Sequence, residues 1–236
     1  MGSSSDTFHF KQFSVCHAGC AMKIGTDGVL LGLLVRSEGR RVLDVGTGSG
    51  LIALLLAQRN ADAQITGIDI DADASRQAAL NFEASPWKER LHAVCEDVRH
   101  HPAEHAYDLV VSNPPYFEHS PATSSAARDT ARLGGSLSHA ELLDVAARLL
   151  APKGRFAVIL PSEQREDFVY GAWQRGMACE EIILIKTTPA KPAKRAILSF
   201  VADGSVRQTE RTFCLSQPDG RRSPEYQQLV QDFFIK

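Results

Sequence analysis

The feature that most constrains this chain is a short strand pattern that runs directly into a glycine-rich turn and an apolar helix. Arg41–Val45 is a β-rich run, Gly46-Thr47-Gly48-Ser49-Gly50 follows at once, and Leu51–Arg59 is apolar through most of its length. Glycines at such a turn let the backbone bend sharply and approach a ligand closely. The pattern therefore predicts an α/β fold with a Rossmann-like nucleotide site whose turn contains Gly46, Gly48 and Gly50.

The spacing of the glycines indicates which nucleotide fits. The pattern is Asp-x-Gly-x-Gly-x-Gly from Asp44, which differs from the G-x-G-x-x-G of pyrophosphate-binding turns. A carboxylate at Asp44 would repel a diphosphate. A nucleoside that carries a cationic or zwitterionic amino acid suits the turn better, so we expect Asp44 to lie at the cofactor.

Two further acidic residues follow the next predicted strands. The strand Gln64–Ile70 ends around Asp69, about 20 residues after the glycines, where an acidic side chain binds ribose hydroxyls. The strand Leu91–Cys95 is followed by Asp97. By the same geometry Asp97 would face the adenine amino group, although a solvated aspartate at a strand end fits the sequence equally well.

A second motif, Ser112-Asn113-Pro114-Pro115-Tyr116-Phe117, follows the predicted strand Tyr107–Val111. Its two prolines end the strand and hold the backbone in a stiff, extended turn at the carboxyl edge of the sheet. Asn113 Oδ1 and the Pro114 carbonyl can accept the two protons of an aromatic amino group, and Tyr116 can stack on its ring. Acceptors placed off the ring plane would aim the nitrogen lone pair at an electrophile. The alternative is a turn that merely ends a strand.

The segment before the first core strand contains a possible anion site. Thr7–Val15 predicts a strand or hairpin lid, and Lys23-Ile24-Gly25-Thr26-Asp27-Gly28 precedes a helix over Val29–Val35. Thr26 or Asp27 is a plausible helix cap. Free amide groups at this helix start would bind a carboxylate, or the same residues simply cap the helix.

The chain after the target motif continues the α/β pattern. Residues 118–136 form a long polar stretch, and the basic, proline-containing link from Thr188 to Arg195 predicts an antiparallel hairpin at the sheet edge. The other predicted elements are helices over 138–150, 163–175 and 223–234 and strands over 154–161, 178–187, 196–201 and 209–215.

Composition narrows the class of protein. With 236 residues, 44% hydrophobic and 23% charged, the chain fits one α/β domain over 1–236, and no apolar run is long enough to cross a bilayer. Five scattered cysteines favour reduced thiols in a cytosol, and Cys16 with Cys20 lacks the second ligand pair of a zinc site. We expect no metal, and we expect His100, His101 and His105 to face solvent.

The net charge of −2 argues against a strong polyanion binder. The charge is unevenly distributed, because residues 1–119 hold 10 basic and 15 acidic side chains (10 − 15 = −5) and residues 120–236 hold 16 and 13 (16 − 13 = +3). One basic face and an ordinary mixed surface both fit this difference.

The glycine turn, the acidic strand ends and Asn-Pro-Pro-Tyr resemble the class I S-adenosylmethionine-dependent methyltransferases that modify exocyclic or amide nitrogens. Segments outside the core make the chain similar to the bacterial tRNA(Val) adenine-N6 methyltransferase family, whose members modify the adenosine 3′ of the anticodon. These segments are Phe10–Phe13, Ala21–Gly28, Ser85–Trp87, Arg128–Arg132 and Ser223–Tyr226.

The resemblance implies a seven-stranded, mostly parallel sheet of order 3-2-1-4-5-7-6 with one antiparallel strand and helices on both faces. It divides the single domain into an N-terminal lid and methionine-end loop (1–36), a catalytic core (37–202) and a C-terminal strand and helix (203–236). It also implies a cytoplasmic enzyme that uses S-adenosylmethionine to methylate N6 of adenosine 37 in tRNA(Val), and we expect a monomer.

The resemblance assigns roles to named residues. Asn113, Pro114 and Tyr116 would hold the target base. The cofactor contacts would be Lys23, Thr26, Asp27, Asp44, Gly46, Gly48, Gly50, Asp69, Asp97 and Asn113. The RNA contacts would be Phe117, Arg128, Arg132, Lys191, Lys194 and Arg195. Asp69 stands where the family commonly has glutamate, which shortens the reach to the ribose.

Three other functions use the same motifs. A protein-glutamine methyltransferase would place a carboxamide in the Asn-Pro-Pro-Tyr turn, but such enzymes typically carry an extra helical N-terminal domain. A DNA adenine-N6 methyltransferase usually needs a separate target-recognition domain. A non-catalytic S-adenosylmethionine-binding module predicts a damaged motif, and both motifs are intact here.

Overall fold

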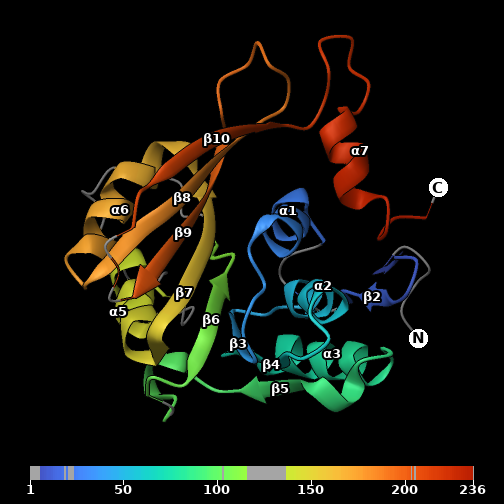
Figure 1. Cartoon of the computed structure of the whole chain (residues 1–236). Helices are drawn as coiled ribbons and strands as arrows, with labels where there is room; N and C mark the ends of the chain where they lie inside the picture. Colours follow the sequence, from blue (N-terminus) through green and yellow to red (C-terminus); the bar gives the residue numbers. More distant parts are fainter. Residues whose placement is uncertain are drawn as a thin grey trace, which may run out of the picture.

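The computed structural model describes residues 6–18, 20, 24–102, 104–115, 137–202, 204 and 206–235. Over these residues the main sheet has eight strands in the order β10-β8-β9-β7-β6-β3-β4-β5 (Figure 1). The strands are β3 (Arg41–Val45), β4 (Gln64–Asp69), β5 (Leu91–Cys95), β6 (Tyr107–Ser112), β7 (Leu150–Pro161), β8 (Met177–Lys186), β9 (Arg195–Ala202) and β10 (Thr209–Cys214).

The order from β5 to β8 is the one that the sequence resemblance implies, with a further strand added. Strand β9 is antiparallel to both β7 and β8, whereas the remaining pairs are parallel. Strand β10 pairs with the outer side of β8, from Thr209 beside Glu181 to Cys214 beside Lys186. The predicted hairpin of β8 and β9 therefore forms, but it does not lie at the edge of the sheet, because β10 covers β8.

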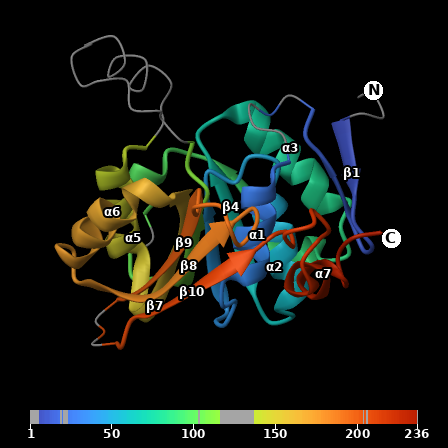
Figure 2. The same cartoon turned by 90° about the horizontal axis from the view of Figure 1, so that it is seen from above.

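Helices cover both faces of the sheet (Figure 2). One face packs against α1 (Thr26–Leu34), α2 (Leu51–Arg59), α3 (Ala72–Glu83) and α7 (Pro224–Val230), and the other against α5 (His139–Leu149) and α6 (Arg165–Trp173). In β6, Leu109 and Val111 belong to the first core, and Val110 belongs to the second. Both faces of β6 are thus buried, which explains the apolar run from Leu109 to Val111.

The N-terminal strands form the predicted hairpin. Strands β1 (Thr7–His9) and β2 (Ser14–Cys16) pair antiparallel, and Phe10 bridges to Phe234 near the C-terminus. Asn81 of α3 joins the hairpin to the glycine turn, because its Nδ2 donates to the Cys16 carbonyl at 2.7 Å and to the Ser49 carbonyl at 2.8 Å. Among the described residues, no helix is both long and apolar enough to cross a membrane.

Helix starts differ in how well local sequence predicted them. Helix α1 begins at Thr26 with Gly25 as its N-cap and has no side-chain cap bond, so neither Thr26 nor Asp27 is the cap. Helix α3 follows the expected rule, because Asp71 accepts hydrogen bonds from the amides of Asp73 and Ala74.

Candidate active site

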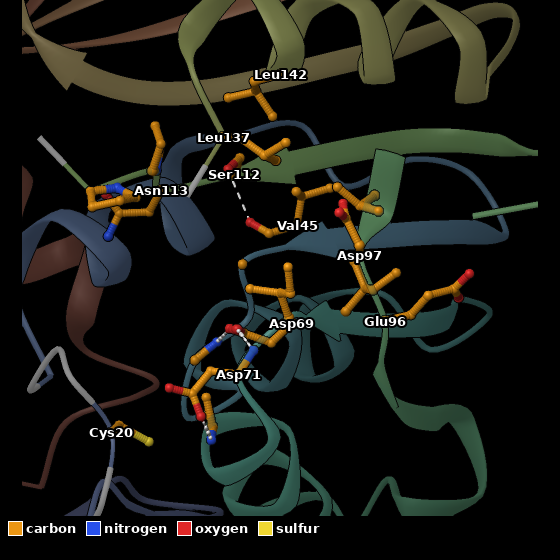
Figure 3. Close-up of a pocket in the computed structure, with 18 residues that line it drawn as sticks. Cys20, Val45, Asp69, Asp71, Glu96, Asp97, Ser112, Asn113, Leu137 and Leu142 are labelled. Carbon is orange, nitrogen blue, oxygen red and sulfur yellow. Dashed lines mark hydrogen bonds between the residues drawn. The ribbon is translucent and has the colours of Figure 1, made fainter. Parts of the chain in front are cut away.

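A cavity of about 270 Å³ lies at the carboxyl ends of β3, β4, β5 and β6 (Figure 3). This is the edge at which open α/β sheets bind ligands. The cavity brings together predicted residues from distant parts of the sequence, namely Gly46, Gly48, Asp69, Asp97, Asn113 and Pro114. Figure 3 shows Asn113 and Asp97 on opposite sides of the cavity, with Asp69 between them.

The glycine turn is held by Asp69. Asp69 Oδ2 accepts from the Gly48 amide at 2.9 Å, and Oδ1 accepts from the Asp71 amide at 3.0 Å. Gly46 and Gly48 have φ angles of 70° and 56°, and a Cβ at either position would meet nothing within 4 Å. The turn is therefore an open cradle whose shape depends on left-handed backbone at two positions.

Gly50 is required for packing. It is the N-cap of α2 with φ 80°, and a Cβ there would lie 2.4 Å from Phe82 Cε1. Gly50 is not among the described residues that line the cavity. We therefore infer that Gly50 allows α2 to pack closely against α3 and does not contact a ligand directly.

Asp44 lies behind the turn, so the expectation of direct contact with a ligand is corrected. It is fully buried and does not line the cavity; its Oδ2 accepts from Thr47 Oγ1 at 2.8 Å and from the Ala53 amide at 3.3 Å. Its Oδ1 has no partner in the described part of the chain. Burial raises the pKa of Asp44 to about 7, so the carboxyl group is largely uncharged below that pH, and the charge argument made from sequence fails.

This burial predicts a pH-dependent stability. The folded-state pKa of Asp44 is raised, so its contribution is fully present below the unfolded-state pKa of about 3.9 and is lost as pH rises through about 7. Asp44→Asn cannot titrate and retains an acceptor. We expect the free energy of unfolding of the wild type to fall relative to this variant between about pH 4 and 7, by at most about 4 kcal/mol. Urea unfolding of both proteins at several pH values measures this. A constant difference would contradict the assignment.

Asp97 is held by Arg99. Asp97 caps the short helix η3 (Val98–His100), and the Arg99 Nε and Nη2 groups donate to its two carboxylate oxygens at 2.7–2.9 Å. These hydrogen bonds hold the pKa of Asp97 below its usual range. Arg99 Nη1 also donates to Glu141 Oε1 at 3.0 Å, and Glu141 forms a capping box with Ser138 at the start of α5. The Asp97 carboxylate is thus ionised and fixed in direction at the cavity.

The proline turn forms the opposite side of the cavity. Asn113 is half-buried, Pro114 is buried and Pro115 is exposed. Ser112 Oγ donates to the Val45 carbonyl at 2.9 Å and joins the ends of β6 and β3. Gly28 in the first turn of α1 has its Cβ position 3.9 Å from Asn113 Nδ2, so α1 packs against this turn.

The remaining predicted residues either do not line the cavity or belong to the segments that the structure does not describe. Thr26 and Asp27 are not among the described lining residues, and Asp27 Oδ2 accepts from Arg195 Nε at 2.9 Å. Lys191 and Lys194 are exposed on the loop between β8 and β9. Five predicted residues lie outside the part of the chain that the structure describes, namely Lys23, Tyr116, Phe117, Arg128 and Arg132.

Some residues at the site were missed or misassigned from sequence. Cys20, Ile70 and Glu96 line the cavity, and burial, followed by Asp69 and Asp71, raises the pKa of the Cys20 thiol. The position of Ile70 and Glu96 directly after predicted strands could have indicated them, whereas nothing indicated Cys20.

His101 was expected to face solvent, and this is wrong. Its Nδ1 lies 3.0 Å from Glu96 Oε2 and its Nε2 lies 2.9 Å from the Tyr107 hydroxyl. In the described part of the chain, no group of three or more His, Cys, Asp or Glu side chains is placed to hold a metal ion.

The methyltransferase small domain family matches residues 18–169 of this chain. The tRNA1(Val) (adenine(37)-N6)-methyltransferases of Yersinia pestis strain Pestoides F and Yersinia pseudotuberculosis serotype O:1b are each 45% identical to it over 234 residues, covering 97% of this chain and 93% of theirs.

Solved structures share the fold. A predicted O-methyltransferase of Agrobacterium tumefaciens has a TM-score of 0.69 at 18% identity, covering 88% of this chain and 96% of its own. The Thermus thermophilus 16S rRNA N2 G1207 methyltransferase, solved with AdoMet and guanosine, has a TM-score of 0.57 at 22% identity, covering 83% of this chain and 50% of its own. These likenesses place the fold among methyltransferases.

Proposed function

Since this chain belongs to the tRNA1(Val) (adenine(37)-N6)-methyltransferase family, we propose that it methylates N6 of adenosine 37 in tRNA1(Val) with S-adenosylmethionine as methyl donor. The observation that carries the proposal is the cavity itself. The glycine turn and Asp69 form one part of its wall, and Asn113 and Pro114 form another. A nucleoside-based donor and an aromatic amine would meet between them.

The residues present fit S-adenosylmethionine. Gly46 and Gly48 leave open space where side chains would stand, so the backbone can approach the nucleoside closely. Asp69 would accept from the ribose hydroxyls, and Asp97 would accept from the adenine amino group. Ile70 is 45% exposed and lines the same cavity as these two carboxylates, where an adenine ring would cover it.

The methionine end of the donor would lie toward the start of α1. Thr26, Asp27 and Lys23 remain our proposed contacts, with Asp27 oriented by its ion pair with Arg195. Asp44 would act from behind the turn: by accepting from Thr47 and from the Ala53 amide, it fixes how the turn enters α2. It is a positioning residue in this proposal.

Asn113 and Pro114 would prepare the target amine. S-adenosylmethionine supplies an electrophilic methyl group when bound. Asn113 Oδ1 and the Pro114 carbonyl would accept hydrogen bonds from the two N6–H groups. These hydrogen bonds would direct the nitrogen lone pair out of the ring plane and toward that methyl group. Tyr116 would stack on the adenine, which must turn out of the anticodon loop to reach the cavity. The proton released from N6 would pass to solvent.

Arg99 provides a test of the adenine contact. Replacing Arg99 with methionine removes the guanidinium that orients and ionises Asp97, so we expect the Kd for S-adenosylmethionine to rise about 3–10-fold with little change in kcat. Because the pKa of Asp97 is lowered by Arg99, the variant should also lose affinity at a higher pH than the wild type as the solution is acidified. Isothermal titration across pH measures both effects.

Ser138→Ala is the matched control for Arg99. It removes the hydroxyl of the capping box but leaves the hydrogen bonds between Arg99 and Asp97 in place. It should lower the stability of α5 and leave the pH profile of cofactor binding unchanged. Equal pH profiles for wild type and Arg99→Met would remove Asp97 from the adenine site.

Nucleoside mass spectrometry tests the proposed function directly. Purified protein, S-adenosylmethionine and unmodified tRNA1(Val) should yield N6-methyladenosine at position 37, and transfer RNA from a deletion strain should lack it. A glutamine-containing peptide substrate serves as the control, because Asn113 could also hold a carboxamide. Methylated peptide with unmodified tRNA would overturn the assignment.

We also propose that the protein is a cytoplasmic monomer and that residues 1–236 form one domain.

A further inference from the structure

The carboxyl edge of the main sheet carries opposite charges at its two ends. At the β4–β5 end the acidic residues are Asp69, Asp71, Asp73, Glu96 and Asp97. At the β8–β10 end, the loops over 187–194 and 215–223, together with the last residue of β8, carry the basic residues Lys186, Lys191, Lys194, Arg221 and Arg222. The target turn at Asn113 lies between these two ends, because β6 is a central strand.

The two basic loops are far apart in sequence but adjacent in space. The Leu215 amide donates to the Lys186 carbonyl and the Ser216 amide donates to the Thr187 carbonyl, each at 2.9 Å. Figure 1 shows the loops projecting together beyond α1. The 215–223 loop is closed on itself by a hydrogen bond from the Gln217 amide to the Arg221 carbonyl at 2.7 Å. Because these bonds join the two loops at their bases, we treat the cations of both loops as one candidate surface, which we call the two-loop surface.

The two-loop surface retains positive charge after its own ion pairs are counted. Arg221 pairs with Asp219 at 2.6 Å, and Arg195 at the base of the first loop pairs with Asp27. In the described part of the chain, no carboxylate lies within 4.0 Å of the Lys191, Lys194 or Arg222 cationic groups. Arg222 lies over the Tyr226 ring at 4.9 Å, which supports its guanidinium while leaving it exposed.

We propose that the two-loop surface, including Arg221 and Arg222, binds the phosphate backbone of the tRNA stem next to the methylated loop. Strands of a sheet lie about 4.8 Å apart, so the ends of β8 and β10 lie about 14 and 19 Å from the end of β6. Cations at this distance would hold the helical stem while the target base enters the cavity. The acidic β4–β5 end repels phosphate, so the RNA approaches from the β8–β10 side only.

This inference rests on the proposed function, and the experiment separates the two. The variants are Lys191→Ala/Lys194→Ala and Arg221→Ala/Arg222→Ala. The matched control is Arg76→Ala/Lys88→Ala, which removes two exposed cations away from the two loops, one in α3 and one just before β5. The readouts are the Kd for tRNA1(Val) over a range of salt, the KM for tRNA1(Val), and the Kd for S-adenosylmethionine.

Each double variant is expected to raise the Kd and the KM for tRNA about 10-fold or more at moderate salt. The slope of log K against log salt should fall by about 0.7–0.9 for each phosphate that the variant no longer neutralises. The control pair should change neither quantity, and cofactor affinity should be equal in all four proteins. Unchanged tRNA affinity and slope in both loop variants would overturn the inference.

A different result would contradict the proposed function: the wild type would bind S-adenosylmethionine and tRNA1(Val) but form no N6-methyladenosine. Weaker tRNA binding in only one double variant would also overturn the inference, because it treats the two loops as one surface. Melting temperatures equal to that of the wild type show that the variants are folded.

Discussion

Replacing Asn113 with alanine is expected to lower kcat by about 10²–10³-fold, while the Kd for S-adenosylmethionine stays within about 3-fold of the wild type. The side chain lines the cavity opposite Asp97, at a distance from the residues proposed to bind ribose and adenine. Its amide oxygen is one of the two acceptors proposed for the target amine. Removing it leaves N6 free to rotate and its lone pair delocalised in the ring, which affects the reaction far more than cofactor binding.

Single-turnover methylation and cofactor titration measure the two effects of Asn113→Ala separately. Asn113→Gln tests geometry, because it keeps the carboxamide but displaces it by one methylene, and it should recover only part of the wild-type rate. Pro115→Ala is the neighbouring comparison, since Pro115 lines the cavity and stiffens the turn but supplies neither of the two proposed acceptors. Wild-type turnover in Asn113→Ala would remove this residue from the reaction.

Replacing Asp69 with alanine is expected to have the opposite signature, with the Kd for S-adenosylmethionine rising about 10–100-fold. The carboxylate has two tasks: it accepts from the Gly48 and Asp71 amides, and it would accept from the ribose hydroxyls. Hydrogen bonds to a charged group contribute about 1.5–3 kcal/mol each, and removing them leaves the Gly48 amide unpaired. At saturating donor, the kcat of Asp69→Ala should recover most of the wild-type value.

Asp73→Ala is the control for Asp69. Asp73 lies close to Asp69 in sequence, but its carboxylate does not line the cavity. This variant should leave the Kd nearly unchanged, since Asp73 is exposed and pairs with Arg76 at 2.6 Å. Asp69→Asn retains one acceptor and should give an intermediate Kd. An Asp69→Ala protein that binds the donor as tightly as the wild type would place the ribose elsewhere.

The fold was largely predictable because its signals are local. Arg41–Val45, Leu51–Arg59 and Leu91–Cys95 form the elements expected over those residues. The order of seven of the strands was implied by the family resemblance and is also present. Apolar runs, glycine turns and proline stops act over a few neighbouring residues. The position of β10 was not predictable, because pairing with β8 depends on contacts between segments distant in sequence.

The site was predictable only as far as it follows strand ends. Gly46, Gly48, Asp69, Asp97, Asn113 and Pro114 each lie at or just after the end of a parallel strand, and the carboxyl ends of such strands meet at one edge. The positions of these residues at strand ends were therefore enough to predict that they share one cavity. The same reasoning put Asp44 and Gly50 in contact with the ligand, and in the folded chain both face the packed interior.

The sequence by itself determined the strand, turn and helix units and the edge at which their polar residues gather, because these depend on short-range periodicity and backbone stiffness. Only the tertiary structure decided which charges remain available. It buried Asp44, bound the Arg99 that orients Asp97 to Glu141 of α5, paired Asp27 with a residue 168 positions away, and joined two basic loops. Burial and pairing depend on sheet register and on desolvation, which no local pattern records.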